Sequence, residues 1–169
     1  MTGVRRPRHR LHDNRGVRTT AKADYAVRAA VELAVSDGSP IAAERIGDAQ
    51  QIPVNFLENI LLDLRRAGIV ESRRGAAGGY LLAKPPREIT VADVVRAVEG
   101  PLASVRGFSP DQLDYEGSAV ALRDVWVALR SAVRSVLEHV TIADVATGKL
   151  PAHVTRLTRE PDAWVRRSR

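Results

Sequence analysis

Apolar residues recur at helical spacing along most of the chain, and this pattern predicts a mainly α protein. The first such segment runs from about residue 22 to 36. Its inner face is formed by Ala26, Ala29, Ala30 and Leu33. Thr20 stands at the N-cap position, and Asp37-Gly38 is a stop signal. We therefore expect a helix here that packs one small-residue face on the core.

Two further helices follow at close spacing. A short one is expected over 43–50, and Pro53 suits the first position of the next, which Gly68 ends. The inner stripe of this third helix comprises Phe56, Leu57, Ile60, Leu61 and Leu64. Two helices joined by a few residues, the second with an apolar inner face, predict a helix-turn-helix.

Strand-like runs follow the third helix directly. Residues 69–73 and 80–83 are short strand candidates, and glycines at 75, 78 and 79 allow a tight reversal between them. Arg73 and Arg74 are then held at the tip of this hairpin, or wing. A hairpin needs no cationic tip to fold, so the two arginines indicate an edge that faces phosphates, whereas the alternative is an ordinary solvated hairpin. A P-loop is excluded because the glycines lead into a strand and not into Lys-Ser/Thr and a helix.

The second half of the chain predicts a short helix, a loop and a long helix. Thr90 to Asp93 has the pattern of a capping box, Gly100-Pro101 ends that helix, and 101–118 is a loop. A long helix is expected over 119–140. Its apolar seam comprises Leu122, Trp126, Leu129, Val133, Val136 and Val140. Packing on its own domain is possible, but so long a stripe favours a partner helix from a second subunit.

The predicted fold class is therefore mainly α with a small β-wing, that is, a winged helix-turn-helix domain plus a long dimerisation helix. Residues 19–87 form the DNA-binding domain, 88–118 the short helix and loop, and 119–147 the dimerisation helix and a short terminal helix that starts at Thr141. Residues 148–169 are expected to be a mobile tail. Residues 1–18 are expected to be a disordered basic extension, either a start assigned upstream of a true start near Val17 or an arm that follows a DNA groove.

Charge is concentrated in one structural unit. The net charge is +6, of which residues 1–18 contribute +5 and residues 151–169 contribute +3, so residues 19–150 carry −2. Residues 65–87 nevertheless contain six cationic side chains and only one acidic side chain, that of Glu71. A nucleic-acid function thus depends on this clustering and not on the overall basicity. No apolar run approaches the roughly 20 residues of a membrane span, so we expect a soluble, cytoplasmic protein.

Four residues of the third helix are candidates for reading bases. Val54, Asn55, Glu58 and Asn59 are expected to point away from the core near the N-terminus of that helix, where recognition helices contact base edges. Asn and Glu side chains pair with adenine and cytosine edges. The alternative is that these side chains are merely solvated.

With its elements in this order, the chain resembles the winged-helix transcription regulators of the IscR, NsrR and CymR type. The resemblance covers Thr19 to about Leu150. It is carried by residues 19–29, Phe56-Leu57-Glu58, residues 64–70, the Arg74-Gly75-x-x-Gly78-Gly79-Tyr80 segment, residues 89–100 and Thr141-x-Ala143-Asp144. It implies a homodimer that binds a palindromic operator in double-stranded DNA through the third helix and the wing, most simply as a repressor. It also implies that Lys22, Tyr25, Arg65 and the wing arginines contact phosphates.

One departure from those relatives concerns the cofactor. Many of them carry three cysteines in the loop before the long helix and hold an iron-sulfur cluster there, but this chain contains no cysteine. No cofactor and no metal site are therefore expected, and His139 and His153 share no ligand spacing. An unidentified small molecule or protein remains open as the effector. No catalytic motif is present, so the alternative to DNA binding is a winged-helix adaptor for protein interaction, not an enzyme.

Overall fold

The structure is a computed structural model that describes residues 19–165. The predictions for residues 1–18 and for the last four residues lie outside this range. The helices are α1 (Ala21–Val35), α2 (Ala43–Gln50), α3 (Val54–Arg66), α4 (Val91–Glu99), α5 (Leu122–Leu137), α6 (Ile142–Thr147) and α7 (Ala152–Thr158), and the strands are β1 (Val70–Arg73) and β2 (Gly79–Leu82). Short 3₁₀ turns lie at Pro86–Glu88 (η1), Pro110–Gln112 (η2) and Gly117–Ala119 (η3).

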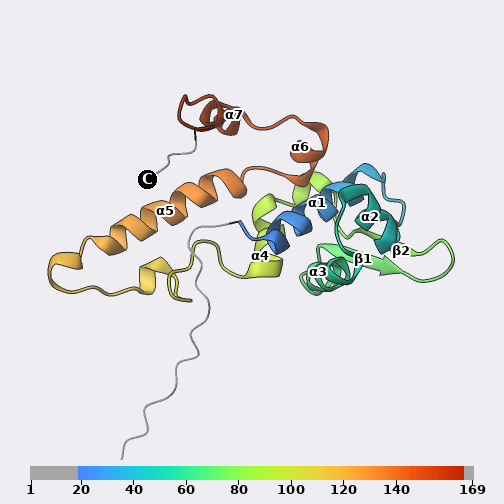
Figure 1. Cartoon of the computed structure of the whole chain (residues 1–169), viewed down its shortest axis with the longest axis horizontal. Helices are drawn as coiled ribbons and strands as arrows, with labels where there is room; N and C mark the ends of the chain where they lie inside the picture. Colours follow the sequence, from blue (N-terminus) through green and yellow to red (C-terminus); the bar gives the residue numbers. More distant parts are fainter. Residues whose placement is uncertain (1–18, 166–169) are drawn as a thin grey trace, which may run out of the picture.

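Helix α1 is the centre of the compact part of the molecule (Figure 1). It packs against α2, α3, α4 and α6. This close approach of four helices is possible because the inner face of α1 is made of alanines, of which Ala26, Ala29 and Ala30 are fully buried. The expected N-cap is confirmed, since the Ala23 backbone N–H donates to the Thr20 hydroxyl at 3.0 Å.

The corner between α2 and α3 is tight. Gln51 closes α2 in the left-handed region with φ 53°, and Pro53 is the N-cap of α3 and not its first residue. A Cβ at Gly47 would lie 2.9 Å from the Ile52 carbonyl oxygen, so this position requires glycine. The helix-turn-helix predicted from the sequence is therefore present, with its geometry fixed by a close backbone contact.

The wing is a two-stranded antiparallel sheet in which Val70 pairs with Leu82 and Arg73 pairs with Gly79. Its base is attached to the segment before α2, because Ile41 and Tyr80 exchange two backbone hydrogen bonds of 2.8 Å. A Cβ at Gly79 would lie 2.5 Å from the Ile41 carbonyl, and Gly79 has φ +148°. Glycine at this position is thus what lets the wing lie against the body.

Two capping boxes start α4 and α6 as predicted. Thr90 and Asp93 cap α4, and Thr141 and Asp144 cap α6. The two starts also lie side by side, because the Val91 N–H donates to the Val140 carbonyl and the Ile142 N–H donates to the Ile89 carbonyl, each at 2.8 Å. This backbone link joins the end of the α5 segment to the start of α4.

Helix α5 extends away from the compact part and contains no buried residue (Figure 1). It is shorter than the predicted 119–140, because η3 precedes it and Glu138 is its C-cap. Val140 lies beyond the helix and is 5% exposed within its own chain. The expectation that Val140 lies on the long helix is therefore wrong, and its side chain is already covered within its own chain.

Two further differences concern the third helix and the tail. Phe56 is 42% exposed and does not belong to the inner stripe. The segment predicted as a tail contains α7, which begins after Pro151 and was not expected from its polar composition. Within residues 19–165, no helix has the length and apolar content that a membrane crossing requires.

Candidate nucleic-acid interface

Helix α3 separates its side chains into a buried and an exposed face. Leu57, Ile60, Leu61 and Leu64 are all fully buried. Opposite them, Asn55, Glu58 and Asn59 are exposed, as predicted for residues that reach a partner. The helix N-terminus also carries partial positive charge, which favours an anionic partner such as DNA.

The polar groups on this face are available for contacts outside the chain. The side chains of Asn55 and Glu58 have no hydrogen-bond or ion-pair partner among residues 19–165. The Asn59 amide donates to the Asn55 backbone carbonyl at 3.0 Å, which leaves its side-chain oxygen open to a donor. An amide can bind an adenine edge with one donor and one acceptor. Asn55 keeps both amide hydrogens and its oxygen for such a pair, and Asn59 keeps one hydrogen and its oxygen.

Val54 is placed differently from the prediction. It is half-buried and packs against the core, where its Cγ2 atom would lie 3.1 Å from a Cβ placed on Gly47. The outward direction expected for Val54 is therefore wrong. The reason is that the tight corner after α2 turns the first residue of α3 toward α2.

The wing presents two arginines without a partner. Arg73 and Arg74 are exposed, and neither side chain forms an ion pair or a hydrogen bond within the described chain. The turn beyond them requires glycine, since a Cβ at Gly78 would lie 2.3 Å from the Arg73 carbonyl oxygen. The wing tip therefore combines fixed backbone geometry with cationic side chains that are available to phosphates.

Arg65 connects the end of α3 to the wing. Its guanidinium donates to the Ser72 hydroxyl of β1 at 3.2 Å, and Arg66 beside it lies 3.5 Å from Asp63. Arg65 is exposed, so its remaining donors face solvent. The helix and the wing are thus tied together on the side where the cationic groups gather.

Tyr25 belongs to a cluster that sequence reasoning only partly identified. Its ring meets Phe56 edge-on with centroids 5.8 Å apart, and the Arg28 guanidinium lies 5.4 Å from the Tyr25 ring centroid. Arg28 also donates to Gln50 at 3.3 Å and pairs with Asp24 at 3.2 Å. The spacing of Tyr25 and Arg28 by three positions on a helix is the signal that would have indicated this pair.

Lys22 has partners inside the protein. Its ammonium lies 2.9 Å from an Asp63 carboxylate oxygen of α3 and donates to the Val98 carbonyl of α4 at 3.0 Å. Two of its three donors are therefore used within the chain. The phosphate contact expected of Lys22 stays a prediction. The Lys22 ammonium has one N–H donor left for it.

The remaining seam residues of α5 are half-buried. Leu122, Trp126, Leu129, Val133 and Val136 are partly covered, and beside them Val125 is 55% exposed. Part of the cover comes from the loop of the same chain, because the Trp126 indole N–H donates to the Tyr115 hydroxyl at 3.0 Å. The seam is thus partly covered by the loop of the same chain at Trp126. Beside the seam, Val125 leaves an apolar strip of α5 open to solvent.

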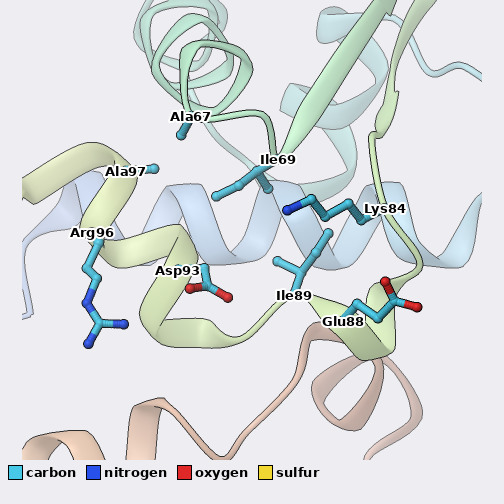
Figure 2. Close-up of a pocket in the computed structure, with 8 residues that line it drawn as sticks. All are labelled: Ala67, Ile69, Lys84, Glu88, Ile89, Asp93, Arg96 and Ala97. Carbon is cyan, nitrogen blue, oxygen red and sulfur yellow. The ribbon is translucent and has the colours of Figure 1, made fainter.

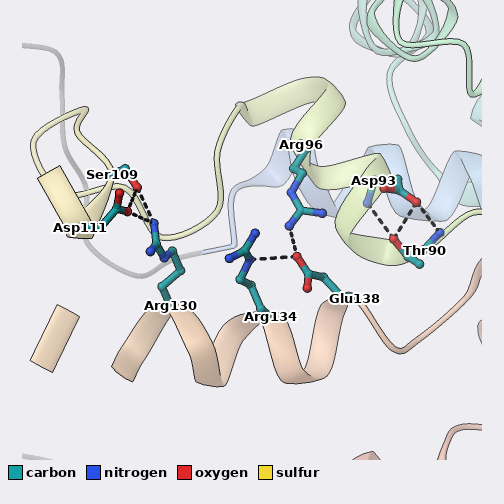
Figure 3. A network of polar contacts seen from close by, with 8 residues as sticks. All are labelled: Thr90, Asp93, Arg96, Ser109, Asp111, Arg130, Arg134 and Glu138. Carbon is teal, nitrogen blue, oxygen red and sulfur yellow. Dashed lines mark hydrogen bonds and ion pairs between the residues drawn. The ribbon is translucent and has the colours of Figure 1, made fainter. Parts of the chain in front are cut away.

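A polar network holds this loop on α5 (Figure 3). Arg130 pairs with Asp111 at 2.6 Å, and the Ser109 hydroxyl contacts both side chains. Nearer the compact part, Glu138 accepts from Arg96 of α4 and from Arg134 of α5. The Ser109 hydroxyl and then the Arg130 guanidinium lower the pKa of Asp111 to about 2, and the Arg96 guanidinium is the main group that lowers the pKa of Glu138.

The arrangement of α2, α3 and the hairpin defines a winged helix-turn-helix protein. Comparison with known proteins places it more narrowly. The model of the Rrf2 family, described as an iron-dependent transcriptional regulator, matches residues 19–148, and the chain belongs to this family.

Relatives and solved structures agree with that assignment. The chain is 51% identical over 142 residues to the HTH-type transcriptional regulator Rv1287 of Mycobacterium tuberculosis. The matched residues cover 83% of this chain and 88% of the relative. It is similar to the structure of CymR, the global cysteine regulator of B. subtilis, with a TM-score of 0.67 at 32% identity over 79% of this chain and 98% of that one. The T. potens IscR structure gives a TM-score of 0.64 at 30% identity over 83% of this chain and 97% of that one.

The protein is therefore a DNA-binding transcription regulator and not an enzyme, as the sequence predicted. The iron-dependent chemistry in the family description does not fit this chain's residues as a thiolate-held cluster, since the chain has no cysteine. In residues 19–165, no three His, Cys, Asp or Glu side chains group as metal ligands would. The loop instead uses its polar side chains to bind α5.

Proposed function

We propose that two copies of this chain bind a palindromic operator, with α3 in the major groove and the wing on the phosphate backbone of each half-site. The regulator then acts as a repressor in the cytoplasm by occupying the operator. The observation that carries this proposal is the shared surface of α3 and the wing. It presents Asn55, Glu58 and the two wing arginines without partners in the described chain.

The roles of these residues differ. Asn55 and Glu58 suit the reading of adenine and cytosine edges, and Asn59 lies beside them with an open oxygen. Arg65, Arg73 and Arg74 suit phosphates, which set position and supply affinity without reading sequence. The Tyr25 ring contacts Phe56 in the first turn of α3. Tyr25 is therefore close to the N-terminal end of α3, where we propose a further phosphate contact.

Helix α5 supports the dimer. A 16-residue amphipathic helix that projects from the body without a buried side chain leaves apolar surface for a partner. Two such helices packed along their seams would set the distance between the two α3 helices. Half-sites one helical turn apart require about 34–36 Å between their centres.

The adaptor alternative is weaker on the same observations. A winged helix that had exchanged DNA for a protein partner would not need unpaired arginines at its wing tip next to exposed amides on α3. Because the chain has no cysteine to hold a cluster, the effector that suits it is a small molecule or a partner protein.

Selection of bound sequences from random DNA by the purified protein tests this function. We expect recovery of a two-fold symmetric sequence. The same selection with Asn55→Ala should lose preference at one base pair in each half-site while the others remain. Recovery of no enriched sequence, with no retention of DNA at low salt, would contradict the proposal and favour the adaptor.

A further inference from the structure

A pocket lies on the side of the DNA-binding domain that faces the second half of the chain (Figure 2). It has a volume of about 360 Å³, within the range of about 300–1,000 Å³ that small-molecule sites occupy. It is formed by the turn after α3, the segment from Lys84 to Ile89 that follows β2 and includes η1, and α4. Its lining residues are Ala67, Ile69, Lys84, Glu88, Ile89, Asp93, Arg96 and Ala97.

Opposite charges share this pocket without pairing with each other. The Lys84 ammonium points into the pocket over Ile69, and the Asp93 carboxylate faces it from α4 (Figure 2). Lys84 has no hydrogen-bond or ion-pair partner among residues 19–165. An ammonium and a carboxylate that lie in one pocket and do not pair are both available to a ligand.

Asp93 keeps one oxygen for such a contact. The Thr90 N–H and the Thr90 hydroxyl both donate to Oδ2 of Asp93, at 3.0 and 2.8 Å. Oδ1 receives no hydrogen bond from the described chain. The capping box thus fixes the orientation of the carboxylate and leaves its second oxygen open.

The other two charged residues have other contacts. Arg96 turns away from the pocket toward α5, where it binds Glu138 (Figure 3). Glu88 lies 3.5 Å from Arg87 and turns its carboxylate outward (Figure 2). The pocket therefore offers one cation and one anion over an apolar floor, in which Ile69 and Ile89 are 7% and 2% exposed.

We propose that this pocket binds a small zwitterion of the amino-acid class. The ligand carboxylate pairs with Lys84, its ammonium pairs with Asp93, and its side chain lies on Ile69 and Ile89. A dianion would meet the Asp93 carboxylate and a simple amine would meet the Lys84 ammonium, so each is disfavoured by the like charge. A ligand that carries both charges satisfies both walls.

A ligand in this pocket could change the affinity of the protein for DNA because of where the pocket lies. This consequence rests on the proposed function. Ile69 joins α3 to the wing, and its carbonyl accepts from Ala83 at 2.9 Å. Ile89 is hydrogen-bonded to Ile142 at the start of α6, next to the end of α5. A ligand on both residues changes operator affinity if it binds one arrangement of the wing and the α5 segment better than the other.

Calorimetric titration of the full chain with each of the twenty L-amino acids, without DNA, tests the binding site independently of the proposed function. We expect at least one to bind with a dissociation constant of about 1 mM or tighter. Lys84→Gln should weaken that binding about 10-fold or more, as the loss of a charge-assisted hydrogen bond does. Arg45→Gln, which removes an exposed cation on α2 that does not line the pocket, should leave it unchanged.

Two derivatives of the amino acid that binds test the zwitterion. The N-acetyl form lacks the ammonium and the carboxamide form lacks the carboxylate, and both should bind about 10-fold more weakly or worse. Equal binding of either derivative, equal binding by Lys84→Gln, or no binding of any amino acid would overturn the proposal. Circular dichroism of both exposed-site variants checks that they are folded.

Discussion

The ammonium of Lys22 lies 2.9 Å from the carboxylate of Asp63, and this ion pair joins α1 to α3. The same ammonium donates to the Val98 carbonyl, so one side chain links three helices. Since both partners are about one-third exposed or less, solvent screens the pair only in part.

Lys22→Met should accordingly reduce the stability of the fold. We expect a loss of about 1 kcal/mol, the usual net value of a hydrogen bond with a charged group at a partly exposed site. Chemical denaturation measures it, and Asp63→Asn should give a similar loss. If Lys22→Met instead leaves stability unchanged and lowers the salt dependence of DNA binding, then Lys22 acts as a phosphate contact and not as a link.

Arg73→Ala and Arg74→Ala should weaken binding to all DNA sequences alike. Each phosphate contact releases counterions, so each loss should lower the slope of log affinity against log salt by about one unit. Fluorescence anisotropy at several salt concentrations measures the slope. Arg123→Ala, which removes an exposed cation from α5, is the matched control and should leave the slope unchanged. An unchanged slope in both wing variants would remove the wing from the interface.

Asn55→Ala should affect specific DNA far more than random DNA. A side-chain pair with a base edge contributes about 1–3 kcal/mol of discrimination, whereas non-specific affinity comes from phosphates. Competition binding of the selected operator against random duplex measures the difference. Equal losses on the two DNAs would mean that α3 does not read a base with this residue.

The contact of the loop with α5 should depend on acid pH through Asp111. Hydrogen bonds from Ser109 and then Arg130 lower its pKa from 3.8 to about 2. Because the pKa is lower in the folded state, the stabilisation is complete above pH 3.8 and is lost as the pH falls toward about 2. Asp111→Asn should therefore lower the thermal midpoint near neutral pH. The difference in thermal midpoint between Asp111→Asn and the unmodified protein should shrink as the pH falls from 3.8 toward about 2.

Fluorescence of Trp126 reports on this contact, since its indole donates to Tyr115 of the same loop. Trp164→Phe as the background leaves Trp126 as the sole tryptophan in the chain. The same change at Asp114, a loop carboxylate for which no ion pair is present in the described chain, is the control. A difference that persists undiminished at pH 2 would show that the charge of Asp111 is not what holds the loop.

Features set by local chemistry could be predicted from the sequence. The capping boxes at Thr90 and Thr141 and the left-handed Gly68 depend on residues at most a few positions apart, and all three are present. The exposed positions of Asn55, Glu58 and the wing arginines also follow from helix and hairpin periodicity. These features were enough to define the winged helix.

Features set by distant contacts could not be predicted in this way. Val140 continues the spacing of the α5 seam, yet its carbonyl is bound by Val91, nearly fifty residues earlier, and this contact takes it into the core. Phe56 has the spacing of an inner residue but meets Tyr25 at the surface. Periodicity gives the face of an isolated helix and does not show which neighbour covers each part of it.

We propose that α5 joins two copies of the chain and thereby places two α3 helices on one operator. Val125→Asp with Leu129→Asp puts one charge on the open apolar strip of α5 and one on the seam beside it, and leaves the contact of Trp126 with Tyr115 in place. Val127→Asp is the matched control, because Val127 is similarly apolar, 36% exposed and displaced from that strip on the helix.

Sedimentation equilibrium of these proteins, followed by binding to the full operator and to a single half-site, is the most direct test. We predict that the double variant is a monomer which binds both DNAs with the same weak, salt-sensitive affinity. The control should remain a dimer that prefers the full operator. A double variant that stays dimeric, or a monomer that keeps the full preference for the palindrome, would contradict this account.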